Sequence, residues 1–441
     1  MGQGVLTDRL TARQALLADA DLEYGPAGQL CGSGVDLASI AHAVGTPAFA
    51  YLAEPIRRRY RAFSEAFAEI PHRIHYAVKA NGNLAVLRLL RELGAGVDIV
   101  SRGELARCLA AGFPAGRIVF SGVGKTPLEL DEAVAAGIGC IHVESLEELE
   151  ALAGLSCPDQ PIRIGIRVNP DVTTDTHPHI STGHAGIKFG IPTDLIDEAA
   201  GIIRGAPGLL LTTIASHLGS QLLDVSPIAE ASATITALAS RLRAEGVGPI
   251  EAVDLGGGLG IRYSTEQPPE PSQLAAAVIP IVKPAGFALH LEPGRALVGS
   301  AGVLLTRVLY RKRAGGKTFV VVDAGMTELA RPSKYGAHHE VVEVVPRAGA
   351  EEECDLVGPI CETGDFLALG RELPPVEPGD LLAILGCGAY GFVMGSNYNA
   401  RPRPPEVLID QGRWAVARPR ESIAALMEGE TADPFALGEL S

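Results

Sequence analysis

The 441-residue sequence has little of what marks several broad classes of protein. Basic residues are too few for a nucleic-acid binder, since 37 Lys and Arg stand against 52 Asp and Glu and the formal charge is −15. No uninterrupted apolar run approaches the roughly 18 residues that a membrane-spanning helix needs. The first residues, MGQGVLTDRL, do not resemble a secretory signal peptide. We therefore expect no nucleic-acid or membrane partner, and we interpret the negative charge as an aid to solubility.

Cysteine is also scarce and follows no known spacing. The number of cysteines is odd and no two form a C-x-x-C pair, which argues against a zinc ribbon, a redox pair or a disulfide framework. We expect a cytoplasmic protein with no metal site, in which most cysteines are small buried side chains. The seven are Cys31, Cys108, Cys140, Cys157, Cys354, Cys361 and Cys387.

From about residue 73, short apolar segments alternate with helical patterns. Such alternation implies parallel strands joined by right-handed crossovers. Eight units in roughly 220 residues fit a TIM-like (β/α)8 barrel better than an open sheet. The alternative is a doubly wound sheet with GGGLG as its phosphate loop, but that motif follows the seventh unit and a Rossmann fingerprint opens the first. The predicted strands are 75–80, 97–101, 118–122, 140–145, 162–168, 213–218, 252–256 and 289–292, with helices between them, for example at 84–93, 103–111, 128–136 and 146–153.

After about residue 300 the pattern changes to strands without long helices between them. The segments 303–311, 318–323, 339–345 and 381–385 are predicted strands, and proline and glycine are frequent around them. A chain of this length is expected to form two domains. We predict a barrel over residues 46–300 and a β-rich domain, sandwich-like or barrel-like, from residues 1–45 and 301–441.

Polar residues follow several of the predicted barrel strands, at the ends where barrel enzymes place their active residues. Lys79 follows an apolar run, and we expect desolvation there to lower its pKa and make it a usable amine. His217 ends the sixth strand, and the glycine run 256–258 follows the seventh, where barrel phosphate sites are common. The eighth strand ends in Glu292 and Arg295. Taken singly, these are also consistent with a snorkelling lysine, a core histidine, a tight turn and a local ion pair.

Together, these residues offer an amine, an aromatic base, a phosphate cradle and a carboxylate. That set matches pyridoxal phosphate chemistry, in which a lysine holds the cofactor and a carboxylate keeps its ring nitrogen protonated. The predicted second domain adds Arg331 and Tyr335, Cys361 and Glu362 in a glycine-bounded loop, and Tyr390. From the residues alone, a surface pair, a buried thiol and a packing tyrosine are the better interpretations of these three features.

The motifs as a set carry a family resemblance. The chain resembles the fold-type III pyridoxal-phosphate decarboxylases, and within them the diaminopimelate decarboxylase family. The resemblance covers residues 46 to 410 and rests on YAVKAN (76–81), GAGVDIVSRGEL (94–105), FSGVGKT (120–126), RVNPDV (167–172), HPHISTG (177–183), KFGI (188–191), SHLGSQ (216–221), DLGGGLGI (254–261), EPGR (292–295), DAGM (323–326), RPSKYGAHHE (331–340), GPICETGD (358–365) and GAYG (388–391).

The resemblance implies a role for each cofactor-binding residue. Lys79 would hold pyridoxal 5'-phosphate covalently, His217 would stack on its ring, and Glu292 would pair with its ring nitrogen. The phosphate would be held by the backbone of two segments. The first is Gly257 and Gly258, and the second is Glu292, Pro293, Gly294 and Arg295.

The resemblance also implies how substrate binds. Cys361 would reprotonate the substrate carbon and Glu362 would contact the far end of the substrate, both serving the site of a neighbouring subunit in a homodimer. The reaction would convert meso-2,6-diaminopimelate to L-lysine and CO2, the last step of lysine biosynthesis. The remaining substrate contacts would be Arg295, Arg331, Tyr335 and Tyr390, of which Tyr390 would also touch the cofactor.

Two departures from the family pattern bear on the substrate. Segment 184–187 lacks the polar residues that often precede KFGI, and Thr327 stands where asparagine is common. They leave open a related decarboxylase acting on another amino acid with a distal carboxylate, such as a citryl-diamino acid in siderophore synthesis. A racemase is disfavoured by the Cys361–Glu362 loop and by the spacing of Arg331 and Tyr335. A catalytically inactive homologue is disfavoured because Lys79, Glu292 and Cys361 are intact.

Overall fold

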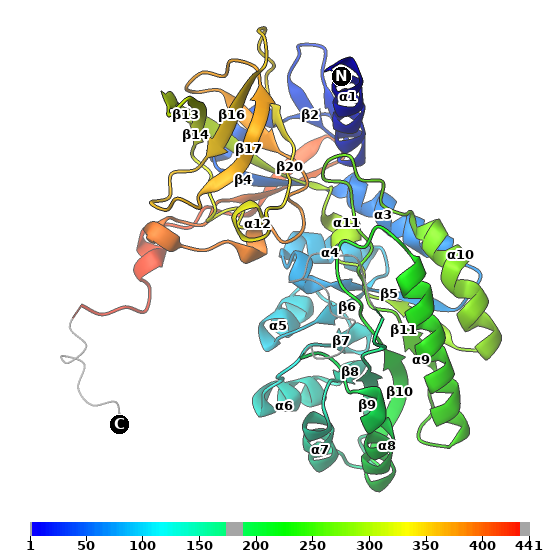
Figure 1. Ribbon diagram of the computed structural model, residues 1–441. Coiled ribbons are helices and arrows are strands. Elements are labelled where there is room, and N and C mark those ends of the chain that lie inside the picture. The colour runs from blue at the N-terminus through cyan, green and yellow to red at the C-terminus, as the bar shows by residue number, and fades with distance from the viewer. Residues whose placement is uncertain (1, 173–187, 433–441) are drawn as a thin grey trace.

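Eight parallel strands close into a barrel, which confirms the fold class predicted from the alternating pattern (Figure 1). The computed structural model describes residues 2–172 and 188–432, with side chains from residue 11 onward. Hydrogen bonding between β12 and β5, with Leu289 opposite His72, joins the last strand to the first. The strands are β5 (His72–Ala77), β6 (Gly96–Ile99), β7 (Ile118–Phe120), β8 (Cys140–Val143), β9 (Ile162–Arg167), β10 (Leu209–Ala215), β11 (Ala252–Asp254) and β12 (Ala288–Leu291).

Helices surround this barrel, and their starts follow signals in the sequence. The side chain of Thr126 accepts a hydrogen bond from the backbone N–H of Glu129 in a capping box, and Pro127 occupies the first helical turn. Gly137 ends the same helix in the left-handed conformation that glycine adopts most easily. The barrel helices are α3 (Ala53–Ala66), α4 (Leu84–Glu92), α5 (Arg102–Ala110), α6 (Pro127–Ala136), α7 (Leu146–Leu155), α8 (Ile196–Gly205), α9 (Ser226–Ala244) and α10 (Pro271–Val282).

The strands end earlier than the sequence predicts. Strand β5 ends at Ala77, and Lys79 lies in the following 3-10 turn, Val78–Ala80. The other seven strands likewise end one to three residues before their predicted ends, for example β12 at Leu291. The polar residues predicted at strand ends therefore mostly lie on the loops above the barrel, where their side chains reach a common space.

A nine-stranded sheet forms the second domain, as predicted for a β-rich region. Its long strand β13 pairs with β4 and β18 in its first half and with β14 in its second half. Strand β4 belongs to this sheet although it follows the predicted boundary at residue 46. The strands are β4 (Ala48–Leu52), β13 (Gly302–Ala314), β14 (Lys317–Val322), β15 (Val341–Glu343), β16 (Glu352–Val357), β17 (Phe366–Leu373), β18 (Leu381–Ile384), β19 (Glu406–Asp410) and β20 (Arg413–Arg418).

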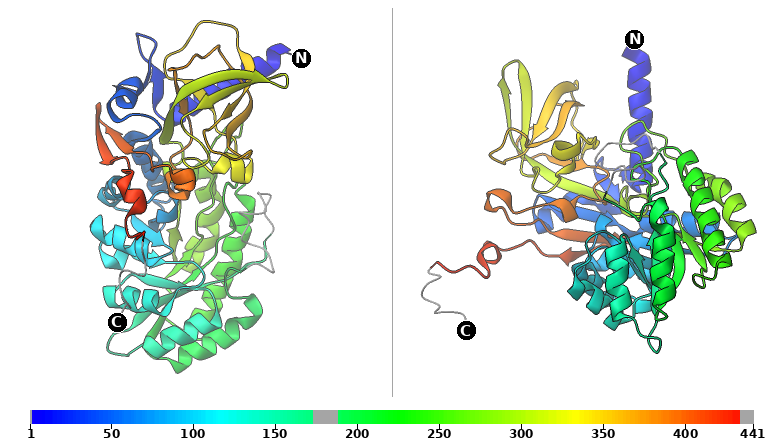
Figure 2. Two further views of the ribbon diagram at one scale, coloured as in Figure 1. Left: turned by 90° about the vertical axis from the view of Figure 1, so that its left-hand side faces the viewer. Right: turned by 60° about the horizontal axis from the view of Figure 1, so that its bottom comes forward.

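The N-terminal segment packs on this sheet. The backbone N–H of Leu30 donates to the carbonyl of Val344 at 2.7 Å, and Leu16 shares a buried cluster with Val303 and Val342. Figure 2 shows the segment against the second domain, while residues 422–432 run away from the body of the molecule. The elements of this segment are α1 (Gly2–Asp19), β1 (Leu22–Tyr24), β2 (Leu30–Gly32), β3 (Val35–Asp36) and α2 (Leu37–Val44).

All seven cysteines are free thiols, and five of them are buried, as the sequence predicts. Among the described residues, no helix combines the length and apolar character needed to cross a membrane.

Candidate active site

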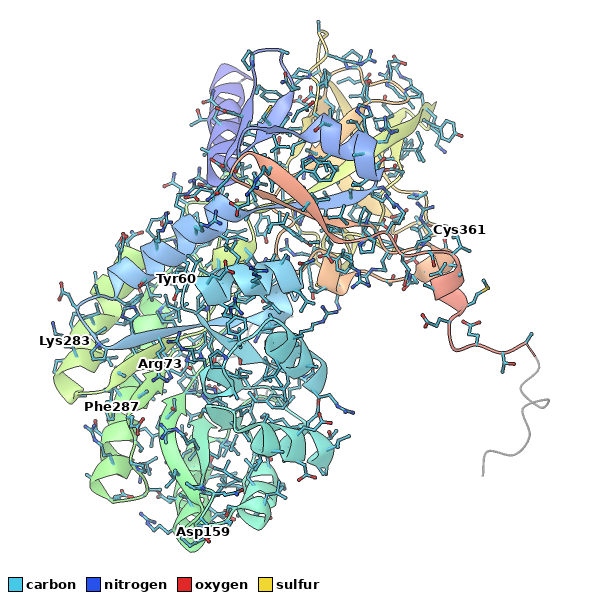
Figure 3. The ribbon with its side chains drawn as sticks, turned by 180° about the vertical axis from the view of Figure 1, so that it is seen from behind. Tyr60, Arg73, Asp159, Lys283, Phe287 and Cys361 are labelled. Carbon is cyan, nitrogen blue, oxygen red and sulfur yellow. The ribbon has the colours of Figure 1, made fainter. Side chains whose placement is uncertain are left out.

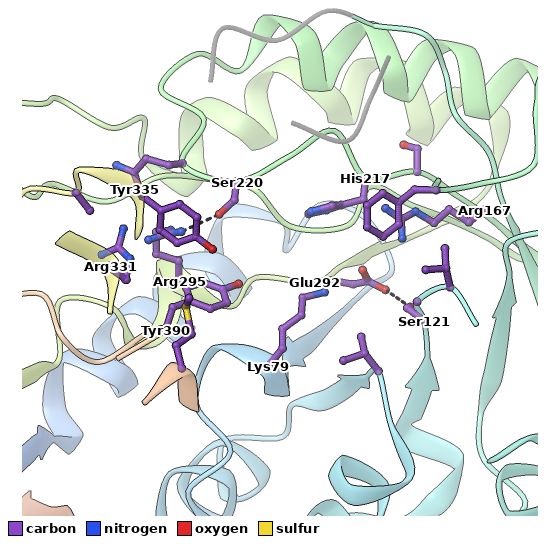
Figure 4. A pocket seen from close by; sticks show the side chains of 18 of the residues that line it. Lys79, Ser121, Arg167, His217, Ser220, Glu292, Arg295, Arg331, Tyr335 and Tyr390 are labelled. Carbon is purple, nitrogen blue, oxygen red and sulfur yellow. Dashed lines mark hydrogen bonds between the residues drawn. The ribbon is translucent and has the colours of Figure 1, made fainter. Parts of the chain in front are cut away.

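A cavity of about 570 Å³ opens at the carboxyl ends of the barrel strands, beneath the second domain (Figure 4). Both domains line it. The barrel supplies the side chains that follow β5, β10 and β12, and the short helix α12 (Arg331–Tyr335) reaches in from the second domain. The predicted site residues that line it are Lys79, His217, Glu292, Arg295, Arg331, Tyr335 and Tyr390.

Lys79 faces an acidic neighbour. Its Nζ lies 3.4 Å from Oδ2 of Asp98, which belongs to the adjacent strand β6 and is fully buried. Burial lowers the pKa of Lys79, but the negative charge of Asp98, supported by Tyr390 and Glu292, outweighs it and leaves the pKa raised. The sequence-based expectation of a lowered pKa is therefore wrong for the protein without cofactor. The expectation considered only the residues next to Lys79 in the sequence, whereas the carboxylate of Asp98 comes from the neighbouring strand β6.

Glu292 lies in a buried acidic cluster. Oxygen atoms of Glu292 and Asp254 and a ring nitrogen of His142 all lie within 4.8 Å of one another. Burial raises the pKa of Glu292 well above its ordinary value, and the charges of Asp254 and Asp98 raise it further. Burial likewise raises the pKa of Asp254 to about 7 and lowers that of His142 to about 3. The floor of the cavity thus holds carboxyl groups that no neighbouring cation fully balances.

The segment after Glu292 packs against the turn that carries Lys79. The backbone N–H of Ala77 donates to the carbonyl of Pro293 at 3.3 Å. A Cβ atom on Gly294 would lie 3.0 Å from the Cβ of Ala80, so only glycine fits here without displacing the turn. Pro293 and Gly294 therefore act through close packing, and the interaction of their backbone with phosphate stays a proposal.

The glycine run beside the cavity orients His217. The backbone N–H of Gly257 donates to Nδ1 of His217 at 3.1 Å, so the ring proton lies on Nε2. Burial lowers the pKa of His217 well below its usual value, and the charges of Arg167 and Lys79 lower it further. A neutral ring facing the cavity suits the predicted stacking against a cofactor. Gly257 and Gly258 do not themselves line the cavity.

Two buried arginines form the opposite wall. Arg295 donates to the hydroxyl groups of Tyr263 and Ser220, the latter at 3.0 Å. Arg331 donates to Nε2 of His339 at 2.8 Å, and its guanidinium carbon lies 4.5 Å from the ring centre of Tyr263. Both arginines are less than one-tenth exposed. A pair of desolvated guanidinium groups provides strong, directional binding for a carboxylate.

Cys361 and Glu362 lie outside this cavity. Both are exposed, and the backbone N–H of Cys361 donates to Oδ1 of Asn399 at 2.9 Å. Figure 3 shows Cys361 on the second domain, near the segment that leads to the C-terminus. Within one chain, neither side chain reaches the residues around Lys79.

Several cavity residues escaped the sequence analysis. Ser121, Arg167 and Ser220 lie near or just beyond the ends of predicted strands, so the strand-end rule applied to every strand would have found them. Asp98, His142 and Asp254 lie inside predicted strands, and Tyr263 lies in the loop before α10, so that rule does not find them. Arg167 donates to Glu144 at 2.8 Å and stacks on Phe189. The motif at 177–183 and the departure at 184–187 lie outside the described residues. The missed residues around the cavity include Asp98, Ser121, His142, Arg167, Ser220, Asp254 and Tyr263.

The residues present fit pyridoxal phosphate. Lys79 offers an amine that points toward Glu292 across the cavity (Figure 4). A protonated ring nitrogen beside Glu292 would supply a positive charge to the buried pair of Asp254 and Glu292. The hydroxyl of Ser220 lines the same cavity and can donate to a phosphate oxygen.

Comparisons with known proteins agree with this geometry. The family model "Pyridoxal-dependent decarboxylase, pyridoxal binding domain" matches residues 53–299. The diaminopimelate decarboxylase of Pseudomonas aeruginosa is 47% identical over 415 residues, which cover 92% of this chain and 98% of that protein.

Solved structures of two relatives have the same fold. The diaminopimelate decarboxylase of M. jannaschii in co-complex with L-lysine is 35% identical, with a TM-score of 0.89 over 95% of this chain and 99% of that one. The Helicobacter pylori enzyme complexed with L-lysine is 37% identical, with a TM-score of 0.85 over 89% of this chain and 98% of that one.

Proposed function

Because the chain belongs to the family of pyridoxal-dependent decarboxylases, among the diaminopimelate decarboxylases, we propose that it converts meso-2,6-diaminopimelate to L-lysine and CO2. This is the last step of lysine biosynthesis. The observation that carries the proposal is the single cavity in which Lys79, Glu292 and Arg331 face one another. The two relatives solved with L-lysine bind the molecule that this reaction would release.

Pyridoxal phosphate is the cofactor of this family, and when bound it supplies an electron sink for the charge left by the departing CO2. We propose that Lys79 holds it and that Glu292 hydrogen-bonds its ring nitrogen. The raised pKa of Glu292 follows from its burial and from Asp254, and a cation beside it would favour the ionised form. His217, held by the backbone N–H of Gly257, would lie against the ring face.

The substrate would bind on the arginine wall. We propose that Arg295 and Arg331 bind carboxylate, because both guanidinium groups are buried and neither has an acidic partner among the described residues. Tyr335 and Tyr390 line the same space and would exclude water from the reacting carbon. Since Arg331 is held by His339, which itself donates to the carbonyl of Leu385, its position is fixed before substrate arrives.

The proton for the substrate carbon would come from a second chain. We propose a homodimer in which Cys361 delivers this proton to the neighbouring site and Glu362 contacts the far end of the substrate. The proposal is supported by the exposure of both side chains and by their position away from the cavity of their own chain. Cytoplasmic location stays a prediction from the unpaired cysteines.

The second candidate function from the sequence is decarboxylation of another amino acid that carries a distal carboxylate. One of the two sequence departures that suggested it, Thr327, has no contact with the cavity. Its hydroxyl donates to Glu328 at 2.9 Å. No feature of the described residues favours another substrate over diaminopimelate.

The direct test is turnover with the purified protein and its cofactor. We expect CO2 and L-lysine from meso-diaminopimelate, and we expect Lys79→Ala to abolish both. A normal cofactor absorbance band without release of CO2 from the wild type would contradict the proposed substrate and leave the cofactor assignment intact.

A further inference from the structure

A second cavity, of about 350 Å³, lies at the opposite end of the barrel from the candidate active site. It is bounded by residues at the amino ends of β5 and β6 and just before β7, and by Tyr60 and Ser64 of α3. Figure 3 shows Tyr60 and Arg73 on this face of the molecule. Nothing in the proposed decarboxylation uses this end of the barrel, where barrel enzymes usually carry only structural residues.

The lining of this cavity is basic. Arg73 and Arg117 contribute guanidinium groups and His72 contributes an imidazole, whereas no aspartate or glutamate lines it. Arg117 uses one nitrogen to donate to the carbonyl of Gly94 at 2.7 Å. No side-chain hydrogen bond or ion pair joins Arg73 to another residue in the described ranges 2–172 and 188–432. The chain as a whole carries a net charge of −15, but this cavity is lined by two arginines and by no aspartate or glutamate, so its local charge is positive.

A buried histidine completes the cavity. His75 is 2% exposed and lines the cavity, and neither of its ring nitrogens makes a hydrogen bond with good geometry. Its ring lies 5.0 Å from that of His290, with the planes tilted. Burial and the charge of Arg73 lower the pKa of His75 to about 4, against a smaller opposing effect of the nearby backbone of Arg117 and Val97, so the ring is neutral and carries one N–H. An unsatisfied buried polar group is costly, and a ligand that accepts its hydrogen bond would remove that cost.

Glycine keeps the space beside this ring open. A Cβ atom on Gly96 would lie 2.6 Å from Nδ1 of His75 and 2.8 Å from the carbonyl oxygen of Arg117. A Cβ atom on Gly116 would meet no atom within 4 Å. The strand ends therefore approach closely beside His75, whereas Gly116 borders open space at the wall of the same cavity.

We propose that this cavity binds a small oxyanion, a phosphate or a carboxylate, between the guanidinium groups of Arg73 and Arg117 and the ring of His75. The planar guanidinium group matches both anions, because each offers two oxygens to a forked pair of N–H donors. The N–H of His75 and the hydroxyl of Tyr60 provide further donors at the wall. The cavity is large enough for the anion to carry an organic part.

The test is calorimetry on the cofactor-loaded enzyme in the presence of saturating L-lysine, so that the phosphate of the cofactor and the carboxylate of lysine already occupy the anion-binding groups of the active site. Inorganic phosphate and succinate are titrated separately. We expect the wild type to bind at least one of them, and the tighter ligand identifies the class of anion. Arg73→Gln and Arg117→Gln should each weaken binding about tenfold, in line with the loss of a charge-assisted hydrogen bond.

Lys283→Gln is the matched control, because Lys283 is a basic residue on the same face that does not line the cavity and pairs with Glu69 at 3.4 Å. It should bind the anion like the wild type, and decarboxylase activity should show that each variant is folded. Equal binding by the wild type and both arginine variants, or no binding of either anion, would overturn the proposal. Should an arginine variant fail to fold, crystals of the wild type soaked in selenate give a second readout, with an anomalous peak beside Arg73 as the expected result and its absence as the refutation.

Discussion

The ammonium group of Lys79 lies 3.4 Å from the carboxylate of Asp98, although 18 residues separate the two in the sequence. Parallel pairing of β5 and β6 creates this contact, because Ala77 lies opposite Asp98 in the register of the two strands. The residue that is proposed to hold the cofactor is therefore kept charged by its neighbour until the cofactor arrives.

This contact predicts how the cofactor attaches. Only the uncharged amine reacts, and Asp98 raises the pKa of Lys79 against the effect of burial. The Asp98→Asn variant lacks the negative charge that most stabilises the protonated amine of Lys79. The cofactor should therefore attach to Lys79 at lower pH. We expect the midpoint of the attachment rate to move down by about one pH unit or more, measured from cofactor absorbance. Asp194→Asn, on the exposed surface of the barrel, is the control, and an unchanged profile in Asp98→Asn would contradict the prediction.

The carboxyl pair of Asp254 and Glu292 predicts a pH-dependent stability of the cofactor-free protein. Burial raises the pKa of Asp254 from 3.8 to about 7, so the folded state binds more protons than the unfolded state between those values. Stability should therefore fall as pH rises from about 4 to 7.

Asp254→Asn removes this ionisation and keeps an oxygen for the backbone N–H of Gly256, which now donates to Oδ1 at 2.8 Å. We expect the cofactor-free variant to gain roughly 1–3 kcal/mol over the wild type at pH 8 and little at pH 5. Urea unfolding at both pH values measures it. An equal change at the two pH values would show that the aspartate is not the titrating group.

The exposed position of Cys361 predicts activity from mixed dimers. Lys79→Ala and Cys361→Ala should each be nearly inactive, the second by about a hundredfold or more because it lacks the proton donor. Mixing the two should restore about a quarter of wild-type activity, because half of the dimers are mixed and each holds one intact site. No recovery after proven exchange of subunits would refute a shared site, and full activity of Cys361→Ala would remove its assigned role.

The close approach of Gly257 to Glu292 predicts a large effect of one methyl group. A Cβ atom on Gly257 would lie 2.3 Å from the carbonyl oxygen of Glu292, and both are backbone positions that cannot move independently. Gly257→Ala should weaken cofactor binding by about tenfold or more, since about 1.4 kcal/mol of strain at Glu292 suffices for that change.

Gly201→Ala is the control for this substitution. Gly201 lies within α8, where a Cβ atom would meet no atom within 4 Å, so the change should leave cofactor binding unaltered and stabilise the helix by roughly 0.5–1 kcal/mol. Fluorescence titration with pyridoxal phosphate compares the two variants. Unaltered binding in Gly257→Ala would show that the contact with Glu292 has no influence on the cofactor.

The sequence by itself determined the barrel. Its eight strands, the helix starts at residues such as Thr126, and the polar residues beyond each strand follow from local patterns, since hydrophobic periodicity and capping act over a few residues. The barrel residues Lys79, His217 and Glu292 could be singled out from this pattern, whereas Arg331, Tyr335 and Tyr390 were assigned to the site only through the family resemblance.

Tertiary structure alone decided how those residues are charged and which of them meet. The raised pKa of Lys79, the pairing of Asp254 with Glu292, and the basic cavity around His75 each arise between strands that are adjacent in space and distant in sequence. The entry of β4 into the second sheet and the distance of Cys361 from its own cavity are of the same kind. Electrostatic and packing interactions depend on these distances in space, which no local pattern of residues records.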